Sequence, residues 1–167
     1  MKLTLTEIHR SEESMKAFKQ LMFMAMLSVF APTDIWSHCE VPCGIYGDSA
    51  RFSAMSEDVK TIEKAMISIN NLSKNSDALS MNQLNRWVDT KEVHANRIQK
   101  TVSQYFMTQR LKAPSTDDDD EKISYRNQLE HLHRILRSAM QCKQTVKIEN
   151  AHELQKLIDE FQVLYNE

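Results

Sequence analysis

Glycine and proline, the residues that most often interrupt helices, are rare outside one short segment of this chain. Its 167 residues include two glycines and three prolines. Both glycines, one proline and two of the three cysteines lie in HCEVPCGIYG, residues 38–47. The remainder is rich in Leu, Met, Lys, Glu and Gln, which favour helices, and lacks the β-branched alternation of a sheet. We therefore expect long helices and one small, stiff loop.

Apolar residues recur at spacings of three and four after this loop, which predicts four helices. The first begins at Asp48 and ends before a polar stretch at residues 70–77, and the second runs from Ser80 to about Arg110. A loop with Pro114 and four consecutive aspartates precedes the third helix. The expected inward-facing residues are, helix by helix, Phe52, Met55, Val59, Ile62, Met66 and Ile69; Leu84, Val88, Lys91, Ala95, Ile98, Val102 and Tyr105; Leu129, Leu132, Leu136 and Met140; and Leu154, Leu157, Ile158, Phe161 and Leu164. Amphipathic helices joined by short polar links pack best as a bundle, so the expected fold is all-α, an antiparallel four-helix bundle.

The first 37 residues have a different pattern. Two lysines precede an uncharged apolar run of eleven residues, 21–31, and a polar stretch ending at Ser37 follows it. This order is typical of a secretory signal, and the run is shorter than the about 20 residues that span a bilayer. We expect residues 1–37 to be a leader or propeptide that is removed, and residues 38–167 to form one domain. The alternative is an interfacial or buried helix that the mature protein keeps.

The leader leaves the start and the location of the protein open. Translation beginning at Met1 or at Met15 gives a basic segment ahead of the apolar run. A secretory signal favours an exported protein, periplasmic or extracellular, while a dedicated processing protease could give the same amino terminus inside the cell. The mature part has no apolar run for a membrane. The net charge of −2 and the lack of a basic run also argue against nucleic-acid binding.

Residues 38–47 carry donors for a metal ion. If cleavage makes His38 the first residue, its α-amine and imidazole, the backbone nitrogen of Cys39 and the thiolates of Cys39 and Cys43 lie within six residues. Nitrogen and sulfur donors in a planar or tetragonal arrangement suit nickel(II) or copper(II), whereas zinc prefers a closed tetrahedron. The alternative without a metal is a disulfide bond between Cys39 and Cys43. We call residues 38–47 the hook.

The hook resembles a known motif. His38-Cys39-x-x-Pro42-Cys43-Gly44-x-Tyr46 is similar, position for position, to the nickel-binding motif at the mature amino terminus of the nickel-containing superoxide dismutases. Two further segments resemble parts of the second helix of that family, and they are Lys91-Glu92-x-His94 and Ser103-x-Tyr105-Phe106. The resemblance extends from about Ser37 to the carboxyl terminus.

This resemblance implies a function and a set of site residues. The family disproportionates superoxide to dioxygen and hydrogen peroxide with one nickel ion per subunit, which cycles between the 2+ and 3+ states. By matched position, the metal ligands are His38, Cys39 and Cys43, and the tyrosines beside the open face of the metal are Tyr46 and Tyr105. His94 lies nearest to the arginine that bonds the axial imidazole in the family.

The resemblance also implies partners. A processing protease has to cut before the histidine, and the family assembles as a homohexamer of four-helix bundles. The alternative that the residues leave open is a nickel or copper carrier, in which the same hook holds the ion without turnover.

Overall fold

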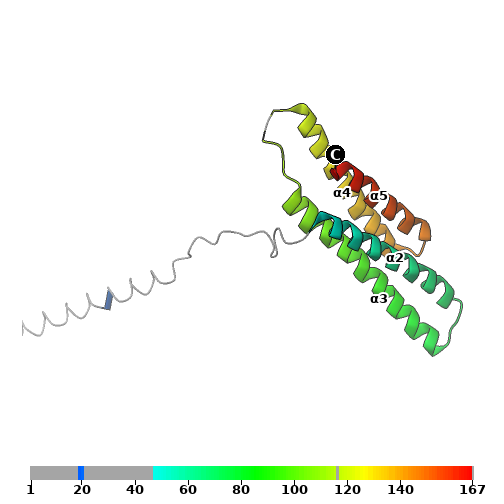
Figure 1. Cartoon of the computed structure of the whole chain (residues 1–167). Helices are drawn as coiled ribbons and strands as arrows, with labels where there is room; N and C mark the ends of the chain where they lie inside the picture. Colours follow the sequence, from blue (N-terminus) through cyan, green and yellow to red (C-terminus); the bar gives the residue numbers. More distant parts are fainter. Residues whose placement is uncertain (1–18, 21–46, 116, 167) are drawn as a thin grey trace, which may run out of the picture. The chain divides into compact units, whose positions relative to one another are not determined.

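The computed structural model of the protein describes residues 19–20, 47–115 and 117–166. The chain divides into two compact units, 1–38 and 39–167, and nearly all the described residues belong to the second. That unit consists of helix α2 (Asp48–Leu72), helix α3 (Ala78–Lys100), the π-helix η1 (Thr101–Arg110), helix α4 (Asp119–Gln144) and helix α5 (Ile148–Asn166). Successive helices run back and forth (Figure 1), and no strand occurs in the described ranges. The expected all-α four-helix bundle is confirmed.

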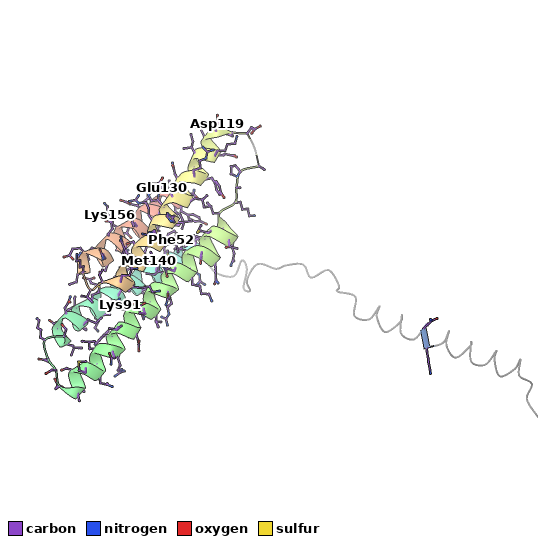
Figure 2. The ribbon with its side chains drawn as sticks, turned by 180° about the vertical axis from the view of Figure 1, so that it is seen from behind. Phe52, Lys91, Asp119, Glu130, Met140 and Lys156 are labelled. Carbon is purple, nitrogen blue, oxygen red and sulfur yellow. The ribbon has the colours of Figure 1, made fainter. Side chains whose placement is uncertain are left out.

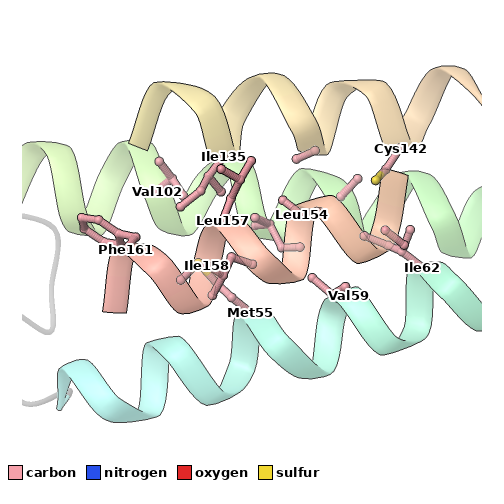
Figure 3. Packing of buried hydrophobic residues seen from close by; sticks show 14 of the residues in the cluster. Met55, Val59, Ile62, Val102, Ile135, Cys142, Leu154, Leu157, Ile158 and Phe161 are labelled. Atoms are coloured by element: carbon pink, nitrogen blue, oxygen red, sulfur yellow. The ribbon is translucent and has the colours of Figure 1, made fainter. Parts of the chain in front are cut away.

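The four helices enclose one apolar core. Helix α2 packs on α3 and α5, and α4 packs on the same two helices. Figure 3 shows side chains from all four elements pointing into the shared interior, with Met55 and Ile62 on α2 facing Leu154 and Ile158 on α5. All six expected inward-facing residues of α2 are buried, so the pattern of the first helix is confirmed. No helix in the described part of the chain combines the length and apolar character needed to cross a bilayer.

The inward face of α4 differs from the expected one. Leu132 is buried as predicted, but Leu129, Leu136 and Met140 are only half-buried. The other apolar positions that α4 buries completely are Ile135, Ala139 and Cys142. Together with Leu132 they follow spacings of three, four and three. The prediction followed the largest apolar residues, whereas the buried face of the helix includes the small residue Ala139.

The end of the second helix is a π-helix. In η1 the amide of Leu111 donates to the carbonyl of Phe106 at 2.8 Å, five residues back, and the Thr108 hydroxyl donates to the Ser103 carbonyl at 2.7 Å. Such spacing widens the turn, so each residue advances by less than the about 100° of an α-helix. As a result Phe106 is fully buried in the core, while Tyr105 is turned to its edge. The predicted inward position of Tyr105 is wrong by one residue.

Lys91 of α3 lies at the C-terminal end of α4 (Figure 2). Its side chain is only 4% exposed, and its ammonium group donates to the Cys142 carbonyl at 2.9 Å and to the Lys143 carbonyl. It also contacts Glu92 at 3.2 Å. The last carbonyls of a helix lack partners within the helix. Lys91 therefore acts as a cap supplied by the neighbouring helix.

Candidate active site

The predicted metal ligands His38, Cys39 and Cys43, and the predicted site residue Tyr46, lie outside the described residues. Two other predicted site residues, Tyr105 and His94, are described. The bundle itself begins with Gly47, which has an extended backbone, and Asp48, the first residue of α2. The site is therefore described at the point where the hook joins the bundle.

Asp48 binds three side chains at this point. Its Oδ1 accepts a hydrogen bond of 2.6 Å from the Tyr105 hydroxyl. Its Oδ2 accepts bonds of 2.5 Å from Nη2 of Arg110 and 3.1 Å from the Tyr165 hydroxyl. Arg110 also donates from Nε to the Tyr165 oxygen at 3.2 Å. These four residues, from α2, η1 and α5, are called the Asp48 cluster below.

The cluster changes the acidity of its members. Burial alone would raise the pKa of Asp48, but the bonds from Tyr105, Arg110 and Tyr165 and the arginine charge outweigh it and lower that pKa. Burial and the bond to the Asp48 carboxylate raise the pKa of Tyr105 to about 12. Burial also raises the pKa of Tyr165. Both tyrosines are therefore neutral at physiological pH, and Asp48 is ionised.

The cluster lies on a layer of aromatic rings. Phe52 of α2, Phe106 of η1 and Phe161 of α5 have ring centroids 4.9 to 5.7 Å apart, and the Tyr165 ring joins them at 5.6 to 5.9 Å. Such offset and edge-on contacts add to the stabilisation from burial. The hydrophobic packing thus fixes the backbones that carry the polar groups above it.

Two guanidinium groups flank the Tyr105 ring. The Arg51 guanidinium carbon lies 5.5 Å from the ring centroid, and that of Arg110 lies 5.9 Å from it. Both distances are within the range of a cation–π contact. The Tyr105 ring is therefore held between two cationic side chains.

His94 lies elsewhere on the bundle. Its Nδ1 is 2.5 Å from Oδ1 of Asp58 on α2, and Arg97 approaches the same oxygen at 3.9 Å. Burial raises the pKa of Asp58, although the bond to His94 and its charge oppose the rise. Ten residues of α2 separate Asp58 from Asp48, which is about 15 Å along the helix. The structure thus brings Tyr105 to the hook junction and does not bring His94 to it.

Three residues of the junction, Asp48, Arg110 and Tyr165, are not expected as site residues from the sequence. One signal was available for Asp48, because an acidic residue in the first turn of a helix is favourable on its own. Nothing in the sequence pattern connects Arg110 and Tyr165 to it.

Cys142 is the free cysteine of the described residues, and it is buried. Burial raises the pKa of its thiol to about 11, so the thiol stays protonated at neutral pH. Within the described ranges no three His, Cys, Asp or Glu side chains gather closely enough to hold a metal ion. The nitrogen and sulfur donors of His38, Cys39 and Cys43 fit nickel by their chemistry.

A four-helix bundle preceded by a hook of imidazole and thiolate donors defines a small helical metalloprotein. Comparison with protein families gives a match to the nickel-containing superoxide dismutases over residues 33–167. The chain belongs to this family. It is an oxidoreductase that acts on superoxide and takes nickel as its cofactor, which decides between the enzyme and the carrier predicted from the sequence. Neither the curated proteins nor the solved structures give a match.

Proposed function

We propose that this enzyme disproportionates superoxide at one nickel ion held by His38, Cys39 and Cys43, after removal of residues 1–37. The ion, when bound, supplies a one-electron couple between its 2+ and 3+ states, which anionic sulfur and nitrogen donors bring within reach of superoxide. The observation that supports this site is the hydrogen bond between Tyr105 and Asp48 at the hook junction.

Chain connectivity relates that bond to the hook. Two residue steps separate Tyr46 from Asp48, so their Cα atoms lie within about 7 Å of each other. Five steps separate Cys43 from Asp48, which allows at most about 18 Å. Because Tyr105 binds Asp48, this limit supports the proposal that both tyrosines lie beside the metal.

The residues of the hook have to lose protons before they bind the metal. The α-amine of His38 has a reference pKa of about 7.7 to 8.0 and a cysteine thiol about 8.5. Nickel binding therefore releases protons and weakens in acid. Tyr46 and Tyr105 would order water and limit access to small anions. The Tyr105 hydroxyl donates its proton to Asp48.

His94 would orient the imidazole of His38. Its Nδ1 is engaged by Asp58, so only Nε2 is available for this bond. The chain segment from His38 to Asp48 is ten residue steps long and reaches at most about 35 Å, which spans the distance along α2. Replacing His94 with Gln tests this role, since a positioning effect lowers turnover more than it lowers nickel content.

The remaining parts of the proposal concern processing and assembly. A protease removes residues 1–37, the leader directs export, and the mature chains form a homohexamer. The basis for export is the leader pattern, and the basis for the protease and the hexamer is the family. Mass spectrometry of the natural product gives its first residue, and sedimentation analysis gives its subunit number.

The test of the function is superoxide decay in the presence of the nickel-loaded polypeptide that begins at His38. We expect decay near the diffusional ceiling of about 10⁸ to 10⁹ M⁻¹s⁻¹. Cys39→Ser or Cys43→Ser abolishes turnover, and His38→Ala retains some nickel but reacts slowly. Cys142→Ala is the matched control, because that thiol is buried in the core, and it leaves the rate unchanged. Full activity of Cys43→Ser would refute the ligand assignment.

A further inference from the structure

We propose that Asp48 is a positioning residue of the dismutase, which holds the Tyr105 hydroxyl at the hook junction. This inference rests on the proposed function, in which Tyr105 lies beside the metal. It extends that function to Asp48, Arg110 and Tyr165.

Both carboxylate oxygens of Asp48 are used, and each has a different task. Oδ1 accepts only the Tyr105 hydroxyl among the bonds described, and this bond sets the direction of that O–H group. Oδ2 accepts from Arg110 and Tyr165, which prevents the carboxylate from turning. A hydrogen bond to an ionised acceptor is about twice as strong as a neutral one. Asp48 therefore holds the Tyr105 hydroxyl in one direction.

Arg110 connects Asp48 with Tyr165. It donates to Asp48 through Nη2 and to Tyr165 through Nε, so one planar group connects α2 with α5. The same guanidinium approaches the Tyr105 ring at 5.9 Å. The ring and the hydroxyl of Tyr105 are thus held by separate contacts. Loss of the charge on Asp48 would loosen both.

Asp48 is close in the chain to the proposed metal ligands. It is the first residue of α2, and Tyr46 precedes it by two residues. Any shift of Asp48 moves the point from which the hook starts. Its side chain is 24% exposed, so solvent reaches the cluster from one side. A polar cluster at this place is suited to hold a site that a small anion enters.

The first experiment measures the bond in the metal-free protein. The ultraviolet absorbance of phenolate is followed with pH, and the curve of Tyr105→Phe is subtracted from that of the wild type to isolate Tyr105. In the wild type we expect a Tyr105 pKa of about 12. In Asp48→Asn, corrected with the Asp48→Asn, Tyr105→Phe double variant, this pKa falls, while burial still holds it above the ordinary value for tyrosine. In Asp48→Glu, which retains the carboxylate, it stays raised.

The second experiment measures turnover of the nickel-loaded proteins in a double-mutant cycle. Asp48→Asn is expected to slow superoxide decay about tenfold at equal nickel content, as is usual when an outer partner of a metal site is lost. In the Tyr105→Phe background the same change has little further effect, because Asp48 acts through Tyr105. Asp89→Asn, an exposed carboxylate on α3, is the matched control and retains full activity.

The outcomes separate this inference from the proposed function. A nickel-loaded wild type that does not consume superoxide refutes the function itself. An active wild type, with Asp48→Asn equal to it in both turnover and Tyr105 titration, overturns the role of Asp48. An equal loss in the Tyr105→Phe background shows that Asp48 acts independently, and this also overturns it. If Asp48→Asn does not fold by circular dichroism, Asp48→Glu decides, since unchanged turnover together with a Tyr105 pKa below that of the wild type contradicts the proposal.

Discussion

Lys91 gives a prediction at the scale of one residue. Its ammonium group donates to two carbonyls in the last turn of α4 from inside the bundle. Lys91→Met keeps the length of the side chain but leaves these carbonyls without this donor. A buried acceptor that loses its partner costs about 1 to 3 kcal/mol. We therefore expect the free energy of unfolding, measured in urea, to fall by at least the cost of one such carbonyl.

The control for Lys91 is the lysine beside it. Lys143 is partly exposed, lies 3.8 Å from Glu92 and donates to the Asn96 side chain at 2.8 Å. Exposed ion pairs contribute about 0 to 1 kcal/mol, so Lys143→Met costs less than Lys91→Met. If both variants lose the same stability, Lys91 is not a cap of α4 and its burial has another cause.

Single residues also show what the sequence can and cannot reveal. The hook was recognisable because its nitrogen and sulfur donors are neighbours in the chain, so their spacing alone predicts a metal site. The Asp48 cluster was not, because its partners lie 57, 62 and 117 residues from Asp48. Such a cluster exists only after the helices have packed. The role of Lys91 as a cap could not be predicted for the same reason, since the carbonyls that it binds belong to another helix.

At the scale of elements, the start of α3 gives a pH-dependent prediction. Asp77 is the N-cap, and its carboxylate accepts from the Ser80 hydroxyl at 2.6 Å and the Ser80 amide at 3.0 Å. These bonds lower its pKa. On acidification the unfolded chain therefore takes up the proton first. The stabilisation is complete above the unfolded pKa of about 3.9 and is lost as the pH falls through the lower, folded pKa.

Thermal unfolding of three proteins tests this cap. At pH 7 we expect Asp77→Ala to melt a few degrees below the wild type, whereas Asp77→Asn, which can still cap, melts close to it. Between pH 5 and about pH 2 the wild type loses stability relative to Asp77→Asn. A constant difference between these two proteins over that range would show that the Asp77 carboxylate is not held by Ser80 in solution.

The elements differ in how much of them the sequence predicts. The spacing of apolar residues gave the four helices and the inward face of α2. It could not give η1, because the α-helical and π-helical readings of residues 101–110 bury Tyr105 and Phe106 alternatively. The choice depends on the aromatic layer that Phe106 joins with Phe52 and Phe161. Tertiary packing therefore decides which aromatic residue faces Asp48.

At the scale of the whole molecule, the fold followed from composition and pattern together. A chain with so few glycines and prolines outside the hook has few ways to turn, and four amphipathic helices bury their apolar faces only against one another. The proposed catalytic chemistry belongs to the hook, the ten residues that contain both glycines and one of the prolines. The family match covers residues 33–167, so it includes the bundle as well as these ten residues.

The last prediction concerns the first residue of the active molecule. Two polypeptides, one beginning at His38 and one at Ser37, differ by a single residue. Only the first has a free α-amine on His38, because in the second this nitrogen is part of an amide, which is a far weaker donor. Loaded with nickel, the first is expected to consume superoxide rapidly, and the second to be nearly inactive. Equal melting temperatures of the metal-free proteins would show that both bundles are intact. Comparable activity of the two would mean that the α-amine is not a ligand and that activity does not require His38 to be the first residue.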